Sequence, residues 1–161
     1  MTVKVQAEDF DLSTEVDALR RAHPEAGALA CFIGVVRDLN QGVAVAQMEL
    51  EHYPGMTEKA LQAIVEQAQA RWPLADALVI HRYGKLAPTD QIVLVAVATA
   101  HRGDAFAACE FIMDYLKTEA PFWKKEVTAA GERWVDAREM DRRALDKWYE
   151  VVLDPVSGSR P

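Results

Sequence analysis

Apolar side chains recur along the chain with two spacings, and the longer spacing predicts two well-defined helices. Apolar positions at i, i+3, i+4, i+7 and i+11 predict a helix that is capped by Thr57 and stopped by Pro73. A second helix is predicted from Asp104, as its cap, to Ala120, because Pro121 ends the pattern. The inward faces comprise Leu61, Ile64, Val65, Ala68 and Trp72 in the first helix and Phe106, Cys109, Met113 and Leu116 in the second.

Shorter helices are predicted towards both ends of the chain. Ser13 is the predicted N-cap of a helix that carries Val16 and Leu19 inward. A final helix is predicted over Arg138–Val152, and the closing sequence DPVSGSRP is typical of a frayed tail. We therefore expect one domain over residues 1–150 and a flexible tail over residues 151–161.

The shorter spacing and several continuous apolar runs predict strands. Ala28–Arg37 predicts a buried strand whose end delivers Arg37. Turn residues at Asp38–Gly42, followed by Val43–Tyr53, predict that this strand returns as a hairpin. Strands and helices mixed without strict βαβ alternation favour a single α+β domain. Further strands are predicted at Val3–Gln6, Ala77–Tyr83, Gln91–His101, Lys125–Thr128 and Arg133–Val135, the last two as a hairpin.

Composition and charge narrow the class of protein. Half of the 161 residues are apolar and 27% are charged, the balance of an ordinary globular domain long enough to bury a core. The 18 basic and 25 acidic side chains give a formal net charge of −7, whereas a nucleic-acid binder normally carries a basic surplus. We therefore expect no nucleic-acid partner, although a local basic pocket for a small anion is compatible with this charge.

Cysteine, histidine and targeting patterns exclude further classes. Cys31 and Cys109 each lie inside an apolar run, which favours small buried side chains over a redox or nucleophilic role. The four histidines lack ligand spacing, so no metal site is expected. The N-terminus is typical of neither a signal nor a transit peptide, and no run reaches the roughly 18 apolar residues of a membrane span. We expect a cytoplasmic protein without a membrane partner.

One candidate anion site is the sequence His101-Arg102-Gly103-Asp104, at the predicted junction of a strand and a helix. Free backbone N–H groups and the positive end of the helix dipole favour an anion there, and two basic side chains strengthen this interpretation. The alternative is that Arg102 is an ordinary surface side chain while Asp104 caps the helix. These residues alone leave both interpretations open.

A second basic group lies at the other end of the same helix. Lys117 falls in the last predicted turn, and Lys124 and Lys125 follow Pro121. Surface lysines that stabilise a helix C-terminus by roughly 0.3–1 kcal/mol are the simpler explanation on spacing alone. The functional alternative is that Lys117 and Lys124 converge on a bound anion.

The length of this helix separates the two basic groups. Asp104 and Lys117 are thirteen residues apart, which is roughly 20 Å at about 1.5 Å per residue. One small ligand cannot contact both ends. Either the chain has two sites, or two subunits combine opposite ends of their helices in shared pockets, which predicts a symmetric dimer.

Several segments together resemble one family. HRGDAFAACEFIMDYLKTEAPFWKKE and the following GERWVDAR are similar to the MoaE family, the catalytic subunits of molybdopterin synthase. GALACFIGVVRD and MELEHYPGMTEKAL resemble the same family in the same order, so the resemblance covers about residues 3–140. It implies an α/β-hammerhead-type α+β fold with an additional antiparallel sheet. The C-terminal KWYEVVLDPVSGSRP has no match that we can assign.

The resemblance also implies a reaction and partners. Members of the family are sulfurtransferases that convert cyclic pyranopterin monophosphate into the dithiolene molybdopterin, in molybdenum cofactor biosynthesis. The sulfur arrives as a thiocarboxylate on the C-terminal glycine of a small ubiquitin-like subunit. A homodimer of large subunits with one small subunit at each end is implied, a heterotetramer. No metal and no cofactor are implied besides this substrate and product.

Site residues follow from the same resemblance. The essential lysine of YLK falls on Lys117, and the second catalytic lysine, in FWK, falls on Lys124. The resemblance implies that residues equivalent to His101 and Arg102 reach the pocket from the neighbouring subunit. The implied substrate contacts comprise Val35, Val36, Arg37, His101, Arg102, Lys117, Lys124, Lys125, Glu126 and, as a weaker match, Arg138.

Two other functions are compatible with parts of this sequence. A non-catalytic α+β dimer could bind a ubiquitin-like partner or a pterin without converting it. A generic dimer could carry these lysines only as surface residues. The presence of Lys117, Lys124 and Arg37 in one chain favours the enzyme.

Overall fold

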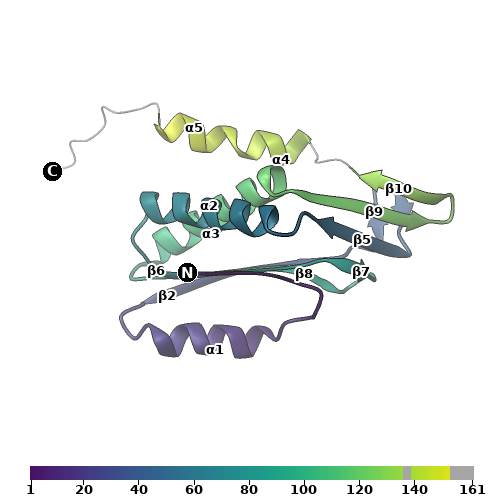
Figure 1. Cartoon of the computed structure of the whole chain (residues 1–161). Coiled ribbons are helices and arrows are strands. Elements are labelled where there is room, and N and C mark those ends of the chain that lie inside the picture. Colours follow the sequence, from purple (N-terminus) through teal and green to yellow (C-terminus); the bar gives the residue numbers. More distant parts are fainter. Residues whose placement is uncertain (136–138, 153–161) are drawn as a thin grey trace.

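A four-stranded sheet of order β1-β6-β8-β2 forms the centre of the fold (Figure 1). The computed structural model describes residues 1–135 and 139–152. β1 runs parallel to β6, whereas β8 runs antiparallel to both of its neighbours. The inner strands β6 and β8 are nearly continuous apolar runs, because helices cover both faces of the sheet. The bounds are β1 (Thr2–Gln6), β2 (Ala28–Val35), β6 (Leu74–Arg82) and β8 (Gln91–Thr99).

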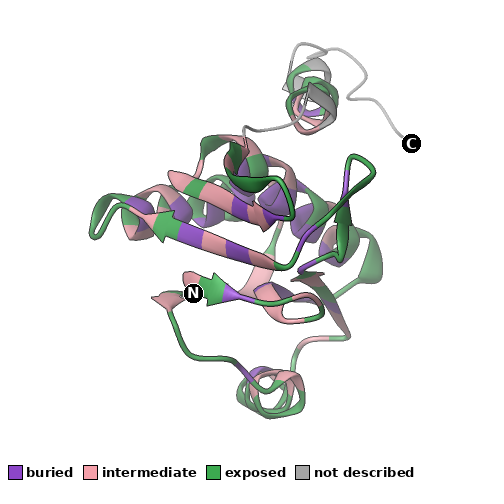
Figure 2. Ribbon diagram, turned by 90° about the vertical axis from the view of Figure 1, so that its right-hand side faces the viewer, coloured by how far each residue is buried: buried purple, intermediate pink, exposed green. Residues whose placement is uncertain are grey.

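Helices lie on both sides of this sheet. α1 (Leu12–Ala22) covers one face, and α2 (Met56–Arg71) and α3 (Arg102–Glu119) pack together on the other (Figure 1). The largest buried cluster fills the space between the sheet and the α2–α3 pair, as the purple segments of Figure 2 show. α4 (Glu139–Ala144) and α5 (Asp146–Val152) lie over α2 and α3 as an outer layer.

A second antiparallel sheet of order β10-β9-β5-β7 lies at one end of the molecule (Figure 1). β9 pairs along its length with both β5 and β10. A small buried cluster of Val36, Met48, Leu50 and Leu86 joins this sheet to the end of β2. The bounds are β5 (Gln47–His52), β7 (Gly84–Leu86), β9 (Phe122–Thr128) and β10 (Gly131–Val135), with a two-stranded ribbon of β3 (Leu39–Asn40) and β4 (Val43–Ala44) nearby.

The predicted α+β class with an additional antiparallel sheet is confirmed, and so are the two long helices. Their caps differ from the prediction. Asp11, not Ser13, caps α1, because its carboxylate accepts from the Thr14 N–H at 2.9 Å. The N-cap of α2 is Gly55, two residues before the predicted cap Thr57. Gly55 adopts φ +83°, which glycine tolerates better than other residues. α3 begins at Arg102, with His101 as its cap residue in place of Asp104.

The predicted hairpin between residues 28–37 and 43–53 is wrong. β2 pairs with β8, and β5 pairs with β7 and β9 in the other sheet. The turn sequence instead closes the small β3–β4 ribbon, where Gln41 and Gly42 both have positive φ. Turn chemistry fixed where the chain reverses, but long-range pairing decided which strands became neighbours.

Three burial predictions were also wrong. β2 is an edge strand of the sheet, and most of it is only partly covered. Cys31 on this strand is therefore exposed, whereas Cys109 is buried as predicted. Phe106 was assigned to the inward stripe of α3 but is 67% exposed, because Ala105 and Ala108 face the sheet instead.

The predicted tail 151–161 lies outside the described residues except for the end of α5, so its flexibility stays a prediction.

Candidate active site

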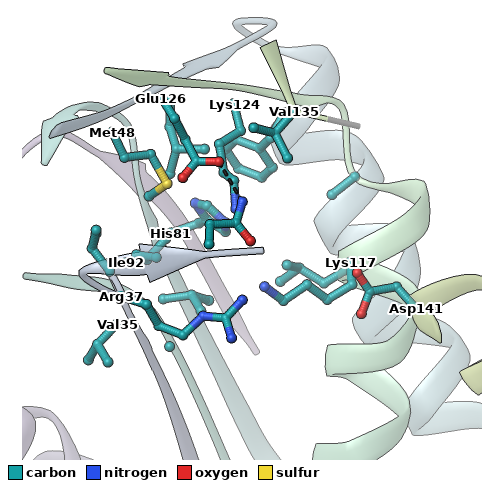
Figure 3. A pocket seen from close by; sticks show the side chains of 18 residues that line it. Val35, Arg37, Met48, His81, Ile92, Lys117, Lys124, Glu126, Val135 and Asp141 are labelled. Atoms are coloured by element: carbon teal, nitrogen blue, oxygen red, sulfur yellow. Dashed lines mark hydrogen bonds between the residues drawn. The ribbon is translucent and has the colours of Figure 1, made fainter. Parts of the chain in front are cut away.

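A cavity of about 330 Å³ lies where the end of β2, the C-terminal end of α3 and strand β9 meet (Figure 3). Three basic side chains line it: Arg37, Lys117 and Lys124. Arg37 and Lys117 come from opposite walls and point towards each other in Figure 3. Such an arrangement of cationic donors suits an anionic ligand.

The backbone next to Arg37 is held by the turn that precedes β8. The Val36 N–H donates to the Asp90 carbonyl at 2.9 Å, and the Thr89 N–H donates to the Val36 carbonyl at 2.8 Å. Val36 is buried, whereas Val35 is half exposed, and both line the pocket with Arg37. The predicted contacts at residues 35–37 are therefore together in one wall.

Lys117 lies in the last turn of α3, whose end is fixed to the start of α2. The Thr57 hydroxyl donates to the Pro121 carbonyl at 3.0 Å and accepts from the Tyr53 N–H at 2.9 Å. Thr57 is fully buried, so this bridge sets the position of the loop between α3 and β9. Thr57 was predicted as a helix cap, but its role in the structure is to join α2 to the loop that follows Lys117.

Strand alternation divides the basic residues of β9 between two faces. Lys124 and Glu126 line the pocket, whereas Lys125, between them, does not. The Lys125 ammonium lies 3.6 Å from the Glu49 carboxylate, 3.7 Å from the Glu132 carboxylate and 5.5 Å from the centre of the Trp134 ring. The structure therefore brings two of these three predicted contacts into the pocket.

Glu126 is the centre of a buried polar network. It is 2% exposed, and its carboxylate accepts a hydrogen bond from the Asn40 side-chain amide at 2.5 Å. The Arg133 guanidinium lies 3.7 Å from the same carboxylate and donates to the Asn40 carbonyl at 3.3 Å. Sequence reasoning missed Asn40 and Arg133, since only the pairing of β9 with β10 and the fold of the β3–β4 ribbon bring them to Glu126.

His81 is a further pocket residue that the sequence did not reveal. It belongs to the buried strand β6, is 5% exposed, and stacks on Phe122 with a ring-centroid distance of 3.7 Å. Its Nδ1 lies 2.8 Å from the Arg82 carbonyl oxygen. Burial lowers the pKa of His81 to about 4, and the nearby charges of Lys117 and His52 act in the same direction, against the effect of the Arg82 carbonyl. His81 is therefore neutral at physiological pH.

His101 and Arg102 do not line this pocket. They begin α3, and the helix has 18 residues, or about 27 Å, with Lys117 near its other end. The structure thus confirms that, within one chain, His101 and Arg102 lie far from Lys117. Arg138 lies outside the described residues.

In the described part of the chain, no group of three or more histidine, cysteine, aspartate or glutamate side chains is placed to hold a metal ion. None of the helices described is both long and apolar enough to span a bilayer.

Fold and site together define an α+β protein with a cationic pocket for an anionic ligand. The sequence model of the family described as "MoaE protein" matches residues 5–119. The molybdopterin synthase catalytic subunit of Ralstonia nicotianae is 66% identical over 98% of this chain and 89% of its own. The chain belongs to the MoaE family.

Solved structures agree with this membership. The molybdopterin biosynthesis MoaE protein of Burkholderia ambifaria is 63% identical, with a TM-score of 0.80 over 92% of this chain and 97% of its own. The molybdopterin synthase of Staphylococcus aureus is 32% identical, with a TM-score of 0.75 over 83% of this chain and 96% of its own. The fold therefore extends to relatives of low sequence identity.

Proposed function

We propose that this chain is the catalytic subunit of a molybdopterin synthase. It transfers sulfur from the C-terminal thiocarboxylate of a small ubiquitin-like subunit to cyclic pyranopterin monophosphate, and the product is the dithiolene molybdopterin. The observation that carries this proposal is the convergence of Arg37, Lys117 and Lys124, from three separate segments, in one pocket of a MoaE-family fold.

The charge of the pocket matches the proposed substrate. Arg37 can donate two parallel hydrogen bonds to phosphate oxygens, and Lys124 adds a second positive charge on the facing wall. Lys117 works beside the incoming thiocarboxylate, either as an acid–base group or by stabilising negative charge that develops on sulfur or oxygen. The reaction as proposed uses no resident cofactor.

The assembly that we propose is a homodimer of this chain with one small subunit at each end, working in the cytoplasm. His101 and Arg102 would then complete the pocket of the neighbouring copy, since their own pocket is a helix length away. Lys125 and Arg138 remain proposed substrate contacts under the same family resemblance.

The decisive experiment is a reconstituted assay. The protein is mixed with a thiocarboxylated small subunit and cyclic pyranopterin monophosphate, and molybdopterin formation is followed. We expect product with the wild type and a loss of at least about 100-fold in rate with a folded Lys117→Ala variant. Lys59→Ala, at an exposed lysine of α2 outside the pocket, is the matched surface control. A wild type that binds the small subunit but forms no product would favour the non-catalytic binding protein instead.

A further inference from the structure

The polar groups of the pocket differ in what they can do with a proton. Arg37, Lys117 and Lys124 are donors when charged, and the Glu126 carboxylate already accepts from Asn40 beside the Arg133 guanidinium. Sulfur transfer from a thiocarboxylate to carbon leaves an acyl–sulfur bond, and cleaving it with water requires a proton acceptor. A further group near the reacting atoms must therefore accept that proton.

The hydrogen bonding of His81 makes one of its ring nitrogens a proton acceptor. A backbone carbonyl oxygen only accepts hydrogen bonds, so the contact between Nδ1 and the Arg82 oxygen requires that Nδ1 carries the proton. In the neutral ring, Nε2 then holds a free lone pair. Nε2 has no hydrogen-bond partner among the described residues, and this nitrogen is not fully buried. His81 also lines the pocket, so its ring lies beside whatever the pocket binds.

The ring is also held in one orientation. The stack on Phe122 has an interplanar angle of 19°, and Phe122 is the first residue of the strand that carries Lys124 and Glu126. Figure 3 shows His81 between Glu126 on one side and the Arg37–Lys117 pair on the other. A fixed acceptor near the reacting atoms is what general-base catalysis needs.

From these contacts we propose that His81 is a catalytic residue whose Nε2 accepts the proton of the water that releases the small subunit. This rests on the proposed function. As water oxygen attacks the acyl carbon, its proton moves to Nε2. The carbon–sulfur bond then breaks with its electron pair on sulfur, and the imidazolium returns the proton to give a thiol on the pterin. The small subunit leaves as a carboxylic acid that loses its proton to solvent.

The charges around the imidazole ring make the basicity of His81 depend on whether substrate is bound. Lys117, Arg37 and Lys124 line the pocket from α3, the end of β2 and β9, and the charge of His52, at the end of β5, also lowers the pKa of His81. Glu126 on β9 and Asp141 on α4 are the acidic groups on the pocket wall. Burial is the main cause of the low pKa of His81, and the charges of Lys117 and His52 act in the same direction. A phosphate and a thiocarboxylate neutralise the cations of the pocket, so Nε2 becomes more basic when the pocket is loaded.

The test is a single-turnover reaction followed by intact mass measurement. His81→Gln keeps an acceptor oxygen near the position of Nε2 but cannot take up a proton. We expect hydrolysis to slow by about 100-fold or more, so that a covalent thioester between the small subunit and the pterin accumulates. His23→Gln, at the end of α1, is the matched histidine control and should form none. Lys117→Ala should also form none, since it is proposed to act in sulfur transfer.

Three outcomes would overturn the proposal for His81. One is a folded His81→Gln variant with the wild-type rate and no adduct. Another is an adduct in Asp141→Asn instead, which would assign the base to Asp141. If His81→Gln does not fold, nitrogen NMR of wild-type histidine decides. We expect an Nδ1–H tautomer in the free protein and a higher pKa in the loaded pocket, and an Nε2–H tautomer overturns the proposal. A wild type without any product would instead defeat the proposed function.

Discussion

At the scale of single residues, the pocket wall depends on two buried polar side chains, Glu126 and His81. Both residues lie in strands, and each has a hydrogen-bond partner that the sequence pattern does not single out. Glu126 binds a side chain 86 residues away, whereas His81 uses the backbone of the next residue. Their energetic roles therefore differ, and the two can be tested separately.

Glu126 should matter more for its acceptor oxygens than for its size. Glu126→Ala leaves the Asn40 amide without this acceptor and the partly buried Arg133 without its carboxylate. We expect a loss of about 2 kcal/mol in the free energy of unfolding. Glu126→Gln keeps an acceptor for Asn40 and should lose about half as much. Urea unfolding measures both, and equal losses would show that the Asn40 bond contributes little.

His81 should make the folded state sensitive to acid. Its folded pKa of about 4 lies below the ordinary value of 6.5, so the unfolded chain binds more protons between these two pH values. The contribution is therefore intact above pH 6.5 and is lost as the pH falls towards 4, by about 3 kcal/mol. The difference in unfolding free energy between wild type and His81→Gln should shrink over this window. Parallel stability curves would contradict the depressed pKa.

At the scale of elements, a buried aromatic side chain of α5 packs the C-terminal helices against the core. Trp148 on α5 is 8% exposed and meets the rings of Trp72 and Phe111 edge-on, at 5.6 and 5.4 Å. Its indole N–H donates to Asp114 at 2.8 Å. Because α4 carries Asp141 into the pocket wall, this anchor also helps to position the wall.

Removing the anchor should loosen both helices. Trp148→Ala deletes the aromatic contacts and one hydrogen bond, and we expect a loss of about 3 kcal/mol in unfolding free energy. Amide exchange in α4 and α5 should rise more than exchange in β6 and β8. Arg142→Ala, on the exposed side of α4, serves as control and should change stability by less than about 0.5 kcal/mol. Uniformly faster exchange throughout the chain would contradict a local anchor.

At the scale of the whole molecule, the basic residues at the two ends of α3 are too far apart to contact one small ligand within a single chain. Lys117 lies in the pocket, whereas Arg102 begins the same helix about 22 Å away. The proposed dimer resolves this separation, since a symmetric pair can place each Arg102 at the other copy's pocket.

Complementation between inactive variants tests the shared site. Lys117→Ala and Arg102→Ala subunits are each expected to be nearly inactive as homodimers. Subunit exchange at equal amounts makes half of the dimers mixed, and each mixed dimer has one intact pocket of two. We therefore expect about a quarter of wild-type activity in the reconstituted assay. Verified mixed dimers without recovered activity would contradict the shared site, because they would mean that Lys117 and Arg102 of the same subunit are required together.

Local patterns in the sequence were enough for the helices and for several strands. The periodicity of Leu61, Ile64, Val65 and Ala68 identified the buried face of α2, since helical spacing places them on one side. The motif around Lys117 and Lys124 identified the family, to which the chain belongs. The family resemblance also supplied Arg37, Lys124 and Glu126, which the fold brings to one pocket.

The α+β class, the two main helices and the basic residues that could bind an anion can be read from the amino-acid sequence alone. The folded chain was needed to show that β2 pairs with β8, that Lys125 faces away from Lys124, and that His81 and Arg133 belong to the site. The difference follows from the range of the interactions. Helical periodicity and turn chemistry act over a few residues, whereas strand pairing and burial join residues dozens of positions apart, which one sequence leaves open.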